Sequence, residues 1–321
     1  MTDSQTPASA AAVDVVGHGL WSPARRPLTG GLVLSITLVA FEALAVSTVL
    51  PVVARELGGL DLYGWVLSAF LLGNLVGVVA VGGLIDRGGL IGPFVGGLVL
   101  FGIGLAIGGA SPSMPILVVG RLLQGLGSGA IAPTAYVAIG RTLPEHLRAR
   151  MFATLSTAWV LPGVMGPVIA GKIAELSSWR FVFLGLIPLI AISGYLAVVG
   201  LRQVPAAEIP EPGEHEQASA AMRRLPRAIV LAGGSALALA GLSSPLPVPG
   251  VGLLVVGLVL AIPAYRDLVP VGTLRARGRL PSAILLRGIA TFTFFSVDAY
   301  VSLLLVEWRG RTPSEAGIAL T

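Results

Sequence analysis

The 321-residue chain has a mean hydropathy of +0.88, with 55% hydrophobic and 12% charged residues, a composition typical of polytopic membrane proteins. Its net charge of +5 does not indicate nucleic acid as a partner, because the basic residues alternate with apolar stretches instead of forming one cluster. The lack of cysteine in the sequence excludes disulfides, thiol chemistry and thiolate metal sites.

Nine apolar stretches predict an all-α membrane protein, since about 20 consecutive apolar residues cross a bilayer as a helix. A polar tail at 1–27 precedes the first stretch, and a polar linker at 201–227 follows the sixth. A proline-rich hinge at 243–250 joins the two shorter stretches after the linker. The stretches run from about Leu28 to Val53, Tyr63 to Ile85, Ile91 to Gly109, Ile116 to Gly140, Phe152 to Ala174, Trp179 to Gly200, Ala228 to Leu242, Val251 to Tyr265 and Ile284 to Val306.

The last residues predict the start of a tenth helix. Thr312 and Glu315 have the spacing of a capping box, with Pro313 at the first helical position. The sequence ends six residues after Glu315, so we expect the chain to be truncated relative to a complete carrier.

The distribution of basic residues predicts the orientation. Of the 21 Lys and Arg residues, fourteen fall on the side of the N-terminal tail and about five on the other side. The remaining two, Arg121 and Arg287, lie within spans. By the positive-inside rule, the N-terminus is expected in the cytoplasm.

The fourth span contains an arginine followed by a stripe of small residues. Arg121 is costly in hydrocarbon, by roughly 2.5–3.5 kcal/mol at mid-membrane, unless it is paired or hydrated. Gly125, Gly127 and Gly129 would let another helix backbone approach closely. The combination indicates a pathway through a helix bundle. The alternative is that Arg121 lies within a turn of the cytoplasmic end and its side chain snorkels to the surface.

Two carboxylates fall near the centres of spans, Glu42 in the first and Asp298 in the ninth. Ionisable groups at this depth are candidate proton or cation sites. The alternative for each is a carboxylate that is only hydrogen-bonded in a helix interface.

Two further patterns lie at the turn after the second span and in the fifth span. The turn with Asp86 and Arg87 is so short that its two helices must be antiparallel neighbours, and Asp86 could accept a hydrogen bond from an adjacent helix as a cytoplasmic latch. An ordinary topogenic turn is the alternative. In the fifth span, Pro167 predicts a kink between small residues, which suits either a rocking helix or static packing.

These motifs together resemble the major facilitator superfamily, and within it the fourteen-helix drug–proton antiporters. Phe41-Glu42 through Pro51 is similar to their first-helix signature, although Glu42 stands where Asp is usual, and Trp179-Arg180 is similar to their start of helix six. The other motif residues are Gly82, Asp86, Arg87 and Gly89 in the loop motif, Arg121, Gln124, Gly125 and Gly127 in the fourth-helix motif, and Gly163, Gly166, Pro167 and Gly171 in the antiporter motif.

The resemblance implies an N-terminal six-helix bundle at 28–200, two inserted helices at 228–265 and the beginning of a second bundle at 266–321. It also implies proton-coupled export of small lipophilic compounds by alternating access in the cell membrane, with Glu42, Arg121 and Asp298 at the cavity. We expect small-molecule substrate, protons and the bilayer as partners, and no cofactor, metal or nucleic acid. The alternatives are a carrier of a native metabolite and a non-transporting truncated protein. An enzyme is not expected, because the sequence has no P-loop and no metal-ligand spacing.

Overall fold

The computed structural model describes residues 19–203 and 214–320 as helices joined by short turns, with no strand among those residues. Within this part, nine helices are long and apolar enough to cross a membrane, which confirms the all-α polytopic prediction. The elements are α2 (Arg26–Leu57), η1 (Leu60–Leu62), α3 (Tyr63–Gly88), α4 (Ile91–Gly109), α5 (Met114–Thr142), α6 (Glu145–Leu176), α7 (Arg180–Leu184), α8 (Leu186–Arg202), α9 (Glu214–Leu242), α10 (Pro247–Leu268), η2 (Thr273–Arg275), α11 (Arg279–Leu303), the π-helical η3 (Leu304–Trp308) and α12 (Pro313–Ala319).

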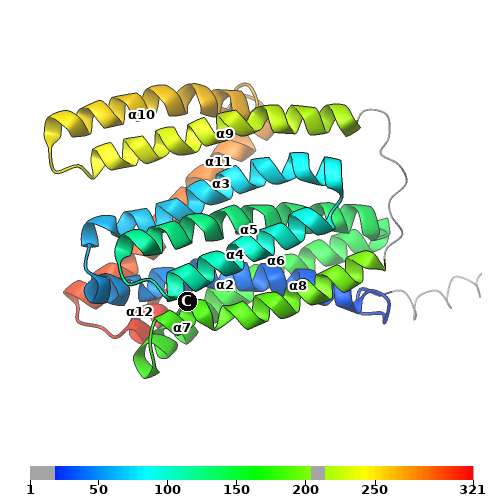
Figure 1. The fold of residues 1–321 in the computed structure, drawn as a ribbon, viewed down its shortest axis with the longest axis horizontal. Coiled ribbons are helices and arrows are strands. Elements are labelled where there is room, and N and C mark those ends of the chain that lie inside the picture. Colours follow the sequence, from blue (N-terminus) through cyan, green and yellow to red (C-terminus); the bar gives the residue numbers. More distant parts are fainter. Residues whose placement is uncertain (1–18, 204–213, 321) are drawn as a thin grey trace, which may run out of the picture.

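Helix α2 is the most enclosed element and positions the site. Its side chains are buried around most of its circumference, whereas α9 and α10 bury few of theirs. It packs against α6 and α8 of the first bundle and also against α11, while α5 lies between α3 and α4 (Figure 1). The α9–α10 hairpin lies to one side, against α3. A group at the middle of α2 can therefore contact both the first bundle and α11.

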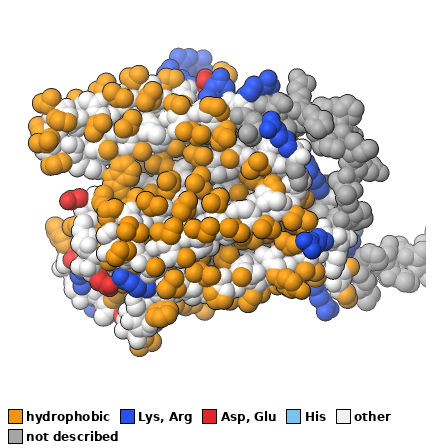
Figure 2. Space-filling model, viewed as in Figure 1, with side chains coloured by type: hydrophobic (Ala, Val, Ile, Leu, Met, Phe, Trp, Pro, Cys, Tyr) orange, Lys and Arg blue, Asp and Glu red, His pale blue; other side chains and the backbone are white. Residues whose placement is uncertain are grey.

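The surface matches a bilayer. Apolar side chains cover the length of the helices, and the Lys and Arg side chains gather at the helix ends (Figure 2). Exposed Leu, Val, Ile and Phe occur on every long helix except the enclosed α2. A soluble protein rarely exposes an apolar area of this extent, so the face in Figure 2 is one that lipid covers.

The predicted linker and hinge are shorter than expected. Helix α9 begins at Glu214, inside the range 201–227 predicted as a linker, because residues 214–227 are rich in Glu, Gln, Ala and Arg, which favour helix. Residues 1–18 of the predicted tail and 204–213 of the linker lie outside the described residues. Helix α10 begins at Pro247, because proline is well tolerated in the first turn of a helix.

The sixth predicted span is two helices. Helix α7 ends at Leu184 and α8 begins at Leu186, with Gly185 between them. Pro188 has no N–H to donate to the Leu184 carbonyl, which interrupts the helical hydrogen bonds at this point.

The end of the described chain folds as predicted. Thr312 accepts a hydrogen bond from the Glu315 backbone N–H, and the Glu315 side chain accepts one from the Thr312 N–H. This confirms the capping box and the tenth helix, α12, which packs against α6.

Candidate functional site

The structure brings Glu42 of α2 and Arg121 of α5 together at the centre of the first bundle. The Arg121 Nη1 donates to Glu42 Oε1 and also to the side-chain oxygen of Gln124, one turn along α5. Both charged side chains are buried, with 0% of Glu42 and 1% of Arg121 exposed. The alternative that Arg121 snorkels to the surface is therefore wrong, because the side chain points inward to a buried carboxylate.

Helix α3 completes the surroundings of the guanidinium. Arg121 Nε donates to the Val66 carbonyl over 3.2 Å, and the Phe70 ring centre lies 4.4 Å from Arg121 Cζ. Removing two charges from water costs several kcal/mol per ion, and these additional contacts offset part of that cost. The sequence gave no signal for Val66 or Phe70, since a backbone carbonyl and an apolar ring do not stand out within a membrane span.

Two polar atoms of the cluster have no hydrogen-bond partner. These atoms are Glu42 Oε2 and Gln124 Nε2, both buried. An unpartnered carboxylate oxygen is costly in an apolar interior, so this oxygen is a ready acceptor for a proton or a donor group.

Asp298 of α11 lies in a different setting from Glu42. Its residue is 7% exposed, and its carboxylate is hydrogen-bonded by the Ser47 side chain of α2. No cation pairs with it among the described residues; Arg121 pairs with Glu42 instead. The two predicted acids therefore have separate partners, one an arginine and the other a hydroxyl.

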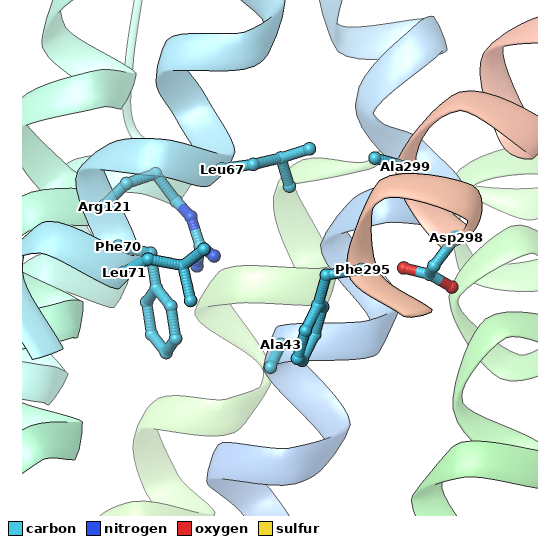
Figure 3. A pocket seen from close by; sticks show the side chains of 8 residues that line it. All are labelled: Ala43, Leu67, Phe70, Leu71, Arg121, Phe295, Asp298 and Ala299. Atoms are coloured by element: carbon cyan, nitrogen blue, oxygen red, sulfur yellow. The ribbon is translucent and has the colours of Figure 1, made fainter. Parts of the chain in front are cut away.

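A narrow pocket of about 40 Å³ connects the two settings. By volume it holds roughly three water molecules. In Figure 3, Arg121 and Asp298 reach it from opposite sides, with Phe295 between them and the Asp298 carboxylate turned away from Arg121. The lining side chains are Ala43, Leu67, Phe70, Leu71, Arg121, Phe295, Asp298 and Ala299.

The glycines of the fourth-helix motif hold the helices around Arg121. A Cβ at Gly125 would lie 2.1 Å from the Phe70 carbonyl oxygen of α3, and one at Gly127 would lie 2.4 Å from the Gly97 carbonyl oxygen of α4. Successive small residues thus admit a different neighbouring backbone on each side of α5, as predicted for this stripe. Because α3 approaches so closely, its Val66 carbonyl comes within reach of Arg121.

The antiporter-motif residues divide between two neighbours of α6. A Cβ at Gly166 would be 3.5 Å from the Phe41 ring of α2, which is ordinary contact, and Gly163 is similarly open. A Cβ at Gly171 would be 2.6 Å from Ser314 of α12, and one at Gly317 would be 2.5 Å from the Pro167 carbonyl oxygen. The tight half of the motif therefore packs against α12, the last described helix.

The loop motif makes a weaker contact than the latch that the sequence predicted. Gly82, Asp86 and Arg87 lie in the last turns of α3, and Gly89 ends the helix with a φ of 74°. Asp86 lies 3.9 Å from Arg141 of α5, beyond hydrogen-bonding distance. This pair joins two helices of the same bundle, and partly exposed pairs of this kind contribute at most about 1 kcal/mol.

The opposite end of the molecule has polar contacts that the sequence did not reveal. Glu56 of α2 accepts hydrogen bonds from the Trp179 indole N–H at 2.7 Å and from Arg180 at 2.9 Å. Arg55 is hydrogen-bonded to Glu307 of η3. Trp179 and Arg180 had been noted only as a motif; their common partner, Glu56, is 123 residues away in the sequence from Trp179.

Glu175, near the end of α6, makes a further contact of this kind. Its carboxylate accepts a hydrogen bond from the Ser314 backbone N–H at the start of α12, over 2.8 Å. Together with the Arg55–Glu307 pair, it ties α2 and α6 to η3 and α12 at one end of the helices.

Comparisons with known proteins agree with this architecture. The family model of the Major Facilitator Superfamily matches residues 32–312. A probable multidrug-efflux transporter of Mycobacterium tuberculosis is 35% identical over 192 residues, 59% of this chain and 40% of that protein. Multidrug resistance protein 3 of Bacillus subtilis is 30% identical over 168 residues, 52% of this chain and 33% of that protein. The matched regions span less than half the length of these relatives.

Solved structures show the same fold at low identity. A bacterial homologue of the human lysosomal transporter Spinster has a TM-score of 0.55 and 15% identity, with 92% of this chain and 88% of that chain covered. A POT family transporter has a TM-score of 0.57 and 14% identity, with 91% and 65% covered.

Proposed function

The chain belongs to the major facilitator superfamily, whose members carry small molecules across membranes, and from this premise we propose that it exports small lipophilic compounds in exchange for protons. The observation that carries the proposal is the buried Glu42–Arg121 pair with an unpartnered carboxylate oxygen. The names of two relatives, a multidrug-efflux transporter and a multidrug resistance protein, support the substrate class.

Protonation of Glu42 is the coupling step of this mechanism. A proton on Glu42 removes the negative charge that faces Arg121, leaving the guanidinium with the Gln124 oxygen, the Val66 carbonyl and the Phe70 ring. The contact between α2 and α5 is then weaker, which favours a rearrangement of these helices. Loss of the proton restores the ion pair. Proton uptake and release are in this way linked to two arrangements of the site.

Asp298 provides a second protonatable group on the other side of the pocket. A carboxyl group among apolar side chains needs no counter-charge when it is neutral, so it can move between environments in its protonated form. Its position on α11, against α2, is consistent with a proton path that runs through both bundles.

Alternating access requires contacts that break at one end. The Arg55–Glu307 pair and the Glu175–Ser314 hydrogen bond hold α2 and α6 against η3 and α12. We assign these contacts to the closed end of the carrier. The small pocket must widen when they separate, because about 40 Å³ is far below the 300–1,000 Å³ of typical ligand sites.

The orientation follows from charge. The end with Arg87, Arg141 and the other basic turns is placed in the cytoplasm of the cell, and the end with Arg55 and Glu307 outside. The protein then resides in the cell membrane with its N-terminus in the cytoplasm.

The test uses inverted membrane vesicles that contain this chain and a pH-sensitive dye in the lumen. Adding tetraphenylphosphonium, a lipophilic cation, should raise the luminal pH as protons leave in exchange. Glu42→Gln should abolish the response, and Asp61→Asn, an exposed acid at the turn before α3, should keep it. An equal response in the Glu42→Gln variant would refute the proposed coupling.

Two other outcomes separate the alternatives. A response to sugars or amino acids alone would identify a metabolite carrier. Binding of the cation by folded, inserted protein without any pH change would favour a non-transporting protein.

A further inference from the structure

A second, larger groove lies outside the Glu42–Arg121 site, between the α9–α10 hairpin and α3. Its volume is about 440 Å³, and its lining is apolar: Trp65, Val230, Gly233, Gly234, Ala236, Leu237, Ala240 and Leu260. Glycine and alanine on α9 create the hollow. A Cβ at Gly233 would meet no atom within 4 Å, whereas one at Gly234 would lie 2.8 Å from the Ala261 nitrogen of α10. The groove is thus open at Gly233 and walled behind Gly234.

The face of α9 that lines the groove also carries arginines at its N-terminal end. Residues three, four or seven apart share one face of a helix, which places Arg223, Arg227, Val230, Gly234 and Leu237 in one row. Arg227 forms an ion pair with Asp267 of α10 at 2.9 Å. Arg223 is exposed and forms no ion pair within the described residues, so its charge is available to a ligand.

The spacing along this row matches one leaflet of a bilayer. Ten residues separate Arg223 from Gly233, which corresponds to about 15 Å of helix. The hydrocarbon of one leaflet is also about 15 Å thick, half of the roughly 30 Å core. A lipid with its phosphate at Arg223 would therefore place the ends of its acyl chains in the groove.

We propose that the groove between α3 and the α9–α10 hairpin binds an anionic phospholipid, with the headgroup at Arg223 and an acyl chain along Val230, Gly233 and Leu237. Charge selects the headgroup, since one arginine near the membrane surface enriches an anionic lipid by about fivefold. The open space at Gly233 admits the chain. The lipid fills the gap between the hairpin and α3 and so stabilises their packing.

Trp65 provides a direct readout, because brominated acyl chains quench the fluorescence of a tryptophan that they touch. The chain is reconstituted in phosphatidylcholine vesicles with a small fraction of brominated phosphatidylglycerol or brominated phosphatidylcholine. The signal of the Trp65→Phe variant is subtracted to isolate Trp65 from the other four tryptophans. We expect half-maximal quenching at an about fivefold lower fraction of brominated phosphatidylglycerol than of brominated phosphatidylcholine.

Two pairs of variants separate headgroup from chain. Arg223→Gln should remove the preference for phosphatidylglycerol, whereas Arg224→Gln, on the opposite face of α9, should keep it. Gly233→Leu should reduce quenching by both lipids because it fills the groove, and Gly252→Leu, at an equally open position of α10, should not. Equal quenching by the two lipids in the unmodified chain would overturn the proposal, as would an unchanged preference in Arg223→Gln.

Discussion

The Glu42–Arg121 pair predicts strong energetic coupling between two residues 79 positions apart in the sequence. In Glu42→Gln, the guanidinium keeps its hydrogen-bond acceptors but loses its counter-charge. In Arg121→Met, the carboxylate loses its cation while the aliphatic stem is retained. Removing one partner of a fully buried pair destabilises a protein by about 3–5 kcal/mol, because the other charge stays buried and unpaired.

The double variant Glu42→Gln/Arg121→Met has no unpaired charge in the site. We therefore expect it to be more stable than the sum of the two single changes predicts, with an interaction energy of at least about 2 kcal/mol. The measurement is the free energy of unfolding of purified protein in mixed micelles, followed by tryptophan fluorescence. Asp298→Asn combined with Arg121→Met is the matched control, because Asp298 does not pair with Arg121. Additive effects of Glu42→Gln and Arg121→Met would refute the ion pair.

Three further changes test the packing and the ends of the helices. Gly127→Ala should destabilise the protein by about 1–3 kcal/mol in the same unfolding assay, since its Cβ would meet the backbone of α4, whereas Gly140→Ala on the same helix is open and should be neutral or stabilising. Glu56→Gln should cost about 1 kcal/mol and shift the emission of Trp179, whose indole N–H it binds; an unchanged spectrum would contradict that contact. Thr312→Ala should lose about 0.5–2 kcal/mol through the capping box, and Thr312→Ser, which keeps the hydroxyl, should not.

Much of the fold could be predicted from local sequence. Apolar length located the membrane helices, and the spacing of Gly125 and Gly127 predicted close backbone contact, because both signals are contained in one helix. The capping box at Thr312 is also local, so the short helix α12 was predicted from four residues.

The partners of the charged groups could not be predicted in the same way. The sequence offered Arg121 two acids, and only the relative depth and rotation of α2, α5 and α11 decide that it meets Glu42. The same reason hid Glu56 as the common partner of Trp179 and Arg180. The contact of Asp86 with Arg141 likewise depends on where α3 and α5 end relative to each other.

The most direct test of the proposed coupling is to count protons released when purified protein binds tetraphenylphosphonium in weakly buffered solution with a pH indicator. We predict that the unmodified chain and Asp61→Asn release protons on binding and that Glu42→Gln binds the cation without release. Undiminished release from Glu42→Gln would contradict the account and place the exchanged proton on another group.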